Sequence, residues 1–316
     1  GPFRLARVQT DLDIRLERSE NFRGPAASLS AIQYAVVRDA STRLNLFRKG
    51  SLDLLSLDRG QIPAARADTA LAGQLKSLPR PAVYYLLFNA KAYPPFADVA
   101  VRRAFAMAID RKRLATQVLG SLEPADRWVP PAILPGAPGS LPPFDPAGAR
   151  QLLAGRRLPT LDLTVRADNP DSKAVAEAIS ADLKTNLGVE VRPAGLEWGA
   201  LLRKRNNGQL AFAFLNWIAD YADPENFLSF LLRTDSGVNF DHWSNAEFDA
   251  LTERADAGSV AENRASLYLK AEGIVLRELP RLPLYFGQDQ VLVSRRVRGL
   301  RSNALGLMPH FRTTVD

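Results

Sequence analysis

The chain has 316 residues, of which 46% are hydrophobic and 24% charged, as expected for a globular protein with one large or two ordinary domains. No run of about twenty apolar residues is present to span a membrane, and the absence of cysteine excludes disulfides, thiol catalysis and cysteine-ligated metal. The net charge of +7 would suit a polyanion, but the arginines are scattered and the densest group, Arg203–Arg205, fits a solvated helix face, so no nucleic-acid partner is predicted.

The first part of the chain alternates short strands with short helices. Apolar alternation around polar turns predicts strands over residues 3–8, 12–16, 32–37 and 52–55. A helix is predicted after Asp39, and Gly50 ends it as a C-terminal cap. A second helix is predicted over residues 64–78. An extended apolar segment at 83–89 then leads to helices over 99–109 and 110–120.

A proline- and glycine-rich loop over residues 126–145 leads into a strictly alternating region. After a short helix from Asp145, the pattern predicts strands at 161–166, 189–193 and 210–215 with helices at 172–187 and 198–206 between them. Alternation of this kind indicates an α/β domain whose strands are buried between helices. Helices at 245–257 and 261–279, strands at 280–286 and 291–293, and an irregular tail complete the chain.

The stretch from Leu210 to Thr234 carries the strongest functional signal. Its apolar run gives way to Trp217, Asp220 and Tyr221, and Asp223-Pro224 then starts a helix with a capping aspartate and a proline at the first position. Side chains at the C-terminal end of a strand lie where open α/β sheets bind ligands. By residue type alone, Asp220 fits ligand contact and a turn aspartate that bonds backbone N–H groups equally well.

This stretch resembles a family pattern. A Trp, then Asp, then Asp-Pro-x-Asn-Phe is typical of the extracytoplasmic solute-binding proteins of family 5, the dipeptide- and oligopeptide-binding proteins of ABC importers. Here the pattern reads Trp217, Asp220 and Asp223-Pro224-Glu225-Asn226-Phe227. The resemblance covers almost the whole chain and includes Asp39-Ala40-Ser41, Gly50, Asp53, Asn89, Pro95, Phe96, Asp98, Val99, Val101, Arg102, Ala104, Ala108 and Ile109.

The resemblance implies an α/β fold of the periplasmic binding protein type II-like kind, with two lobes and a hinged ligand cleft. Residues 1–87 and 285–316 would form part of a first lobe, incomplete here, and 88–284 a complete second lobe. The opening Gly1-Pro2-Phe3 resembles a family strand that normally lies well inside the chain, so we expect an N-terminal segment to be missing.

The function implied is capture of a dipeptide or oligopeptide and its delivery to the permease subunits of an ABC importer, without a cofactor. The protein would be periplasmic or anchored at the cell surface, and would meet the membrane only through the permease or a lipid anchor. Two alternatives stay open: the ligand-sensing domain of a transcriptional regulator with the same fold, and a binding protein for nickel chelates or sugars.

The resemblance also implies ligand contacts. Asp220 would pair with a peptide ammonium. Dipeptide-binding members carry Arg-x-x-Asn-Pro at a strand-to-helix connection, where the arginine holds the ligand carboxylate, and this chain has Arg166 in the matching position. A guanidinium fork suits a carboxylate, although Ala167 replaces the family's proline and an exposed arginine without a ligand is also consistent with the sequence.

Further candidates surround these two charges. Trp217 would wall the ligand slot or equally form part of the core, with Ile218 and Tyr221 beside it. Asn239 and Trp243 are weaker candidates for the cleft.

Enzymatic functions find no support in the motifs. His242 and His310 lack a partner at metal-ligand spacing, so a surface role fits them better and no metal site is predicted. Gly-x-Ser-x-Gly, Gly-x-Gly-x-x-Gly and a phosphate-binding Gly-Lys-Ser/Thr are all absent. We therefore predict a binding protein and not an enzyme.

Overall fold

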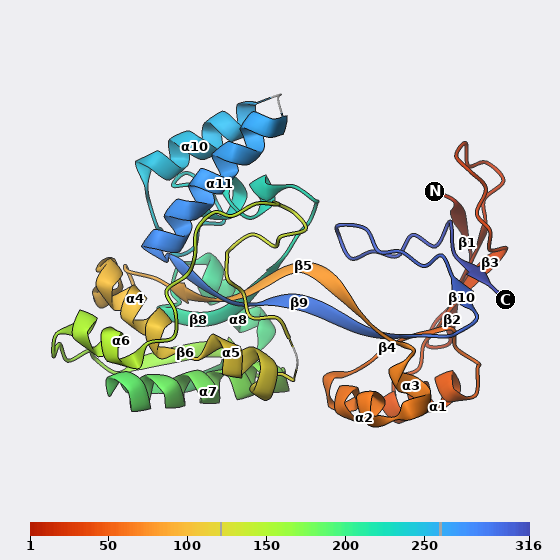
Figure 1. Cartoon of the computed structure of the whole chain (residues 1–316), viewed down its shortest axis with the longest axis horizontal. Helices are drawn as coiled ribbons and strands as arrows, with labels where there is room; N and C mark the ends of the chain where they lie inside the picture. Colours follow the sequence, from red (N-terminus) through yellow and green to blue (C-terminus); the bar gives the residue numbers. More distant parts are fainter. Residues whose placement is uncertain (121, 259–260) are drawn as a thin grey trace. The chain divides into compact units, whose positions relative to one another are not determined.

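A computed structural model describes residues 1–120, 122–258 and 261–316 (Figure 1). The chain forms two compact units, Gly1–Arg80 with Gln288–Asp316 (unit 1) and Pro81–Gly287 (unit 2). The division falls within strands β5 (Leu75–Phe88) and β9 (Arg281–Val293), which also contain the lobe boundaries predicted at 87/88 and 284/285. The lobe boundaries themselves stay a prediction. Among the described helices, none is long and apolar enough to cross a membrane.

Unit 1 contains small sheets and short helices. Strands β1, β2 and β3 form an antiparallel sheet, and β4 pairs with the end of β9. A small core gathers Phe47, Leu55, Leu71 and Leu292. Its elements are β1 (Phe3–Gln9), β2 (Asp13–Arg18), β3 (Ala31–Ala35), α1 (Ala40–Arg48), β4 (Leu54–Ser56), α2 (Ile62–Ala67), α3 (Thr69–Ala72), β10 (Val297–Arg298) and β11 (Thr314–Val315).

The helix predicted over 64–78 is wrong in its second half. Asp68 leaves the helical conformation and accepts the Ala70 N–H, so α2 ends and α3 starts there. Strand β5 (Leu75–Phe88) begins soon after Gly73, and Pro79 and Pro81 within it are incompatible with a helix interior. The two strands predicted at 280–286 and 291–293 are in fact one continuous strand, β9 (Arg281–Val293).

Unit 2 contains the predicted strand–helix alternation, which is confirmed. Strand β6 pairs in parallel with both β7 and β8, and β8 pairs antiparallel with β5, in the order β5-β8-β6-β7. Helix α7 packs against β6 and β7 (Figure 1). The elements are α4 (Val99–Ala108), α5 (Arg111–Arg113), α6 (Pro146–Leu153), β6 (Leu161–Arg166), α7 (Pro170–Leu187), β7 (Val191–Leu196), α8 (Trp198–Asn206), β8 (Phe212–Ile218), α9 (Ser229–Leu232), α10 (Ala246–Ala257) and α11 (Ala261–Glu278).

Aromatic side chains fill the core beneath this sheet. Phe88, Phe96, Phe105 and Phe212 are almost wholly buried, and the Phe88 and Phe212 rings stack with their centres 5.5 Å apart. Burial of four such rings contributes several kilocalories per mole of stability at about 25 cal/mol per Å² of apolar surface. Strand β8 is therefore firmly held at its start, and its other end can present polar side chains to a ligand.

Candidate ligand-binding site

The candidate site lies where two parallel neighbours, β6 and β8, end. Thr164 pairs with Ala213, and continuing this register places Arg166 beside Leu215. Strand β8 runs on to Ile218, three residues or roughly 10 Å further at the usual rise of a strand. The loops that follow both strands leave the same edge of the sheet, which is where open α/β sheets hold ligands.

Asp220 is an exposed carboxylate with no partner. In the described part of the chain, its side chain makes no hydrogen bond or ion pair. Its backbone N–H donates to Oδ1 of Asn226 at 3.0 Å, and the N–H of Ala219 donates to the Pro81 carbonyl at 2.8 Å. The loop is thus fixed through its backbone, and the alternative in which the Asp220 side chain bonds backbone N–H groups is not what the structure has.

Asn226 is the residue that organises this loop. It is completely buried, and its Oδ1 accepts from both the Asp220 N–H and the Trp217 indole Nε1–H at 3.0 Å each. Its Nδ2 is buried and has no hydrogen-bond partner among the described residues. The Trp217 ring is half-buried and lies 5.6 Å from the Phe230 ring, so it supports the loop while one part remains accessible.

Asp223 caps the next turn, as the sequence predicts. Its side chain accepts from the Glu225 N–H at 2.9 Å and from both terminal nitrogens of Arg264, at 2.6 and 2.8 Å. Burial raises the pKa of Asp223, but the Arg264 fork and the Glu225 N–H outweigh it, so the pKa is lowered overall. The helix predicted here is only a turn over Pro224–Asn226, because Leu228 is non-helical and α9 starts after it.

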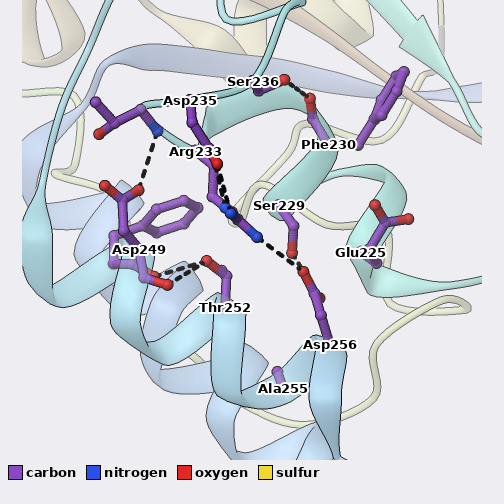
Figure 2. A network of polar contacts seen from close by, with 12 residues as sticks. Glu225, Ser229, Phe230, Arg233, Asp235, Ser236, Asp249, Thr252, Ala255 and Asp256 are labelled. Carbon is purple, nitrogen blue, oxygen red and sulfur yellow. Dashed lines mark hydrogen bonds and ion pairs between the residues drawn. The ribbon is translucent and has the colours of Figure 1, made fainter.

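Polar contacts then tie α9 to α10 (Figure 2). The guanidinium of Arg233 forms a fork with Asp235, at 3.0 and 2.7 Å, and lies 3.6 Å from a carboxylate oxygen of Asp256. The Ser229 hydroxyl donates to Asp256 at 2.8 Å. Helix α10 therefore holds the helix that follows the loop, which limits how far the Asp223 turn can shift.

Arg166 stands at the end of β6 and is already paired. Its Nε and one terminal nitrogen donate to the two carboxylate oxygens of Asp168, at 2.5 and 2.7 Å. Its guanidinium carbon lies 5.0 Å from the centre of the Trp198 ring, a cation–π contact. The hydrogen bonds that Arg166 donates to Asp168 raise the pKa of Arg166, and a ligand carboxylate would have to replace or share that aspartate.

Two exposed apolar side chains flank Asp220. Ile218 is 39% exposed and Tyr221 43% exposed, so both leave apolar surface open beside the carboxylate. The Tyr221 hydroxyl donates to the Glu225 carboxylate. Burial and this contact raise the pKa of Tyr221, so the phenol stays neutral and available as an apolar surface with a polar tip.

Asn239 and Trp243 are engaged in the loop after α9. The side-chain amide of Asn239 is buried and donates to the carbonyls of Arg233 and Trp243, at 3.1 and 2.8 Å. The Trp243 ring meets the Phe248 ring edge-on, 5.1 Å between centres. Both side chains serve the packing of that loop, and their ligand contacts stay predictions.

Only one of the unpredicted site residues has a signal in the sequence. Asn226 belongs to the Asp-Pro-x-Asn-Phe pattern, and its place in that pattern was the clue to its importance. Arg264 lies 41 positions after Asp223 and stands in no motif, so its fork was not predictable. Within the described residues, no three histidine, aspartate or glutamate side chains cluster as a metal site needs.

Comparison with known proteins identifies relatives over most of the chain. A family model described as bacterial extracellular solute-binding proteins, family 5 Middle, matches residues 1–239. The dipeptide-binding protein DppE of Bacillus subtilis is 30% identical over an alignment of 323 positions, which covers 97% of this chain and 58% of DppE. Heme-binding protein A of Haemophilus influenzae is 31% identical over an alignment of 327 positions, which covers 100% of this chain and 59% of the relative. The chain thus spans about three fifths of these relatives' length.

A solved structure shows the same fold. HbpA2 from Haemophilus parasuis superimposes with a TM-score of 0.84 at 26% identity, covering 100% of this chain and 64% of that one. The predicted α/β fold class is confirmed.

Proposed function

The chain belongs to the bacterial extracellular solute-binding proteins of family 5, and we propose that it captures a short peptide outside the cytoplasm for delivery to the permease of an ABC importer. Proteins of this family bind solutes, and the proposed function involves no covalent step. The relatives described as dipeptide-binding support a peptide as the ligand.

The unpaired carboxylate of Asp220 is the observation that supports this proposal most. A carboxylate that a ligand covers must find a positive partner, because an unpaired buried charge is costly. A peptide α-ammonium supplies that charge together with three N–H donors. The exposed surfaces of Ile218 and Tyr221 would hold the first residue of the peptide beside it.

Arg166 would receive the peptide carboxylate. Its fork with Asp168 is half-exposed, and exposed ion pairs are weak, so a ligand carboxylate can replace the aspartate at small cost. The roughly 10 Å by which β8 extends beyond Arg166 corresponds to about three residues of extended peptide. The spacing therefore favours a tripeptide or a longer peptide over a dipeptide.

A second candidate ligand is a porphyrin, because a heme-binding protein is among the relatives. A porphyrin carries carboxylates but no ammonium group, so it would pair with Arg166 and leave Asp220 without a partner. Asp220 thus favours the peptide.

Calorimetric titration with trialanine, dialanine and hemin tests the proposal. We expect trialanine to bind at least about tenfold more tightly than dialanine, a difference of about 1.4 kcal/mol. Tighter binding of hemin than of either peptide would overturn the peptide assignment. Tighter binding of dialanine would be consistent with a peptide ligand but would show that the site does not favour tripeptides.

A further inference from the structure

Unit 1 contains a pocket that the proposed peptide site does not use. It has a volume of about 420 Å³, which is within the range of small-molecule sites. It opens between the end of α1, the end of α3 and the segment that follows β9. Phe47, Ala70 and Leu71 supply apolar lining, and the charged lining comes from four cationic side chains: Arg48, Lys49, Arg295 and Arg296.

The charges around this pocket are unbalanced. None of its lining residues is acidic. Arg48 bonds Asp68 at 2.8 Å and Arg296 bonds Asp53 at 2.7 Å, both in half-exposed pairs. In contrast, the side chains of Lys49 and Arg295 make no hydrogen bond or ion pair within residues 1–120, 122–258 and 261–316.

Several backbone carbonyls near the two free cations are already engaged by N–H groups. At the end of α1, the carbonyls of Asn45, Leu46 and Phe47 already accept from the N–H groups of residues 49–51. The Gln74 side chain is also engaged, because its amide donates to the Ala70 carbonyl. An anion that enters the pocket would therefore meet unpaired donors.

We propose that this pocket binds an organic phosphate, with the phosphate between Lys49 and Arg295 and the carbon skeleton against Phe47 and Leu71. Lysine and arginine are the usual partners of phosphate, and Phe47 and Leu71 are buried apolar residues that line the same pocket. The two half-exposed pairs can rearrange toward the ligand at small cost. The phosphate belongs either to a soluble ester or to the headgroup of an anionic lipid.

Two probes distinguish these sources. The soluble probe is sn-glycerol 3-phosphate, followed by amide NMR shifts at Lys49, Gly50 and Ser294. The membrane probe is vesicles of phosphatidylcholine with phosphatidylglycerol, followed by co-sedimentation and compared with vesicles of phosphatidylcholine alone. The wild-type protein is expected to bind at least one probe.

The pocket variant is Lys49→Glu with Arg295→Glu, and it should bind the effective probe at least about tenfold more weakly. The matched control is Lys76→Glu with Arg23→Glu. It makes the same charge change on exposed residues of unit 1 that do not line the pocket. Its affinity for the probe should stay within about twofold of the wild-type value. Should the pocket variant unfold, Lys49→Gln with Arg295→Gln replaces it. No binding of either probe, or an equal loss in pocket and control variants, would overturn the proposal.

Discussion

The loops after β6 and β8 are built alike, but the charged side chain is paired in the first loop and unpaired in the second. In each loop an asparagine oxygen accepts two N–H groups: Asn169 accepts from Asp171 and Ser172, and Asn226 from Trp217 and Asp220. After β6, Arg166 finds its counter-ion two residues away in Asp168. After β8, the neighbouring donors are taken by the asparagine, so the Asp220 carboxylate is left free. The difference suggests that one loop is ready for a ligand and the other must first exchange a partner.

We expect the greatest loss of stability when Asn226 is replaced, and a smaller one at Asn169. Asn226→Ala removes the acceptor of two donors in a buried position, and we expect a loss of about 2–4 kcal/mol in the free energy of unfolding. Asn169→Ala removes only a helix cap and should cost about 1 kcal/mol. Urea unfolding of both variants measures the difference. Equal losses would mean that Asn226 stabilises the loop after β8 no more than Asn169 stabilises the start of α7.

A smaller loss in the free energy of unfolding is expected from Arg264→Met, which removes the paired hydrogen bonds between Arg264 and Asp223. The charged hydrogen bonds should contribute about 1.5–3 kcal/mol near neutral pH. Because the pKa of Asp223 is lowered in the folded protein, this stability is present above its ordinary pKa of 3.8 and is lost as the pH falls through the lowered folded value.

Urea unfolding of wild type and Arg264→Met over a range of pH checks this dependence. The gap between the two proteins should narrow below about pH 3.8. Arg192→Met, which removes an exposed pair with Asp162 on β6, is the control and should change little. A gap that is constant with pH would contradict the role given to the Asp223 carboxylate.

The smallest effect is expected at Asp168. Asp168→Asn frees the Arg166 guanidinium, so peptides with a free C-terminal carboxylate should bind about two- to fivefold more tightly, as expected for removal of a weak exposed competitor. Calorimetry with trialanine and its C-terminal amide measures this gain, which the amide should not show. Weaker binding of trialanine would mean that Asp168 orients Arg166 and does not compete with the ligand.

Local patterns were sufficient for the regular elements around the site. Strand β6 and helix α8 have the bounds predicted from apolar periodicity and capping residues, Leu161–Arg166 and Trp198–Asn206. The single helix predicted at 64–78 is wrong because helical patterns lie on both sides of Asp68, and no local signal shows that this aspartate ends one helix and caps the next.

The site itself was predictable only in part. Arg166 and Asp220 each lie at or just after the end of a strand, and their charges indicated a ligand-binding site. The sequence did not indicate which of the two charges would be unpaired. That depends on side-chain geometry within each loop, namely the fork of Asp168 on Arg166 and the two bonds of Asn226. The Arg264–Asp223 fork depends on how α11 packs, which no local pattern specifies.

A double-mutant cycle tests whether Asp220 contacts the ammonium group of a bound peptide. The cycle combines Asp220→Asn with trialanine and N-acetyl-trialanine, and calorimetry measures all four affinities. We expect Asp220→Asn to weaken trialanine binding by about 2–4 kcal/mol, the cost of one unpaired buried charge. Acetylation should cost the wild-type protein a similar amount and the variant much less, because both changes remove one interaction. Fully additive losses would show that Asp220 does not contact the ammonium group and would overturn the proposed peptide site.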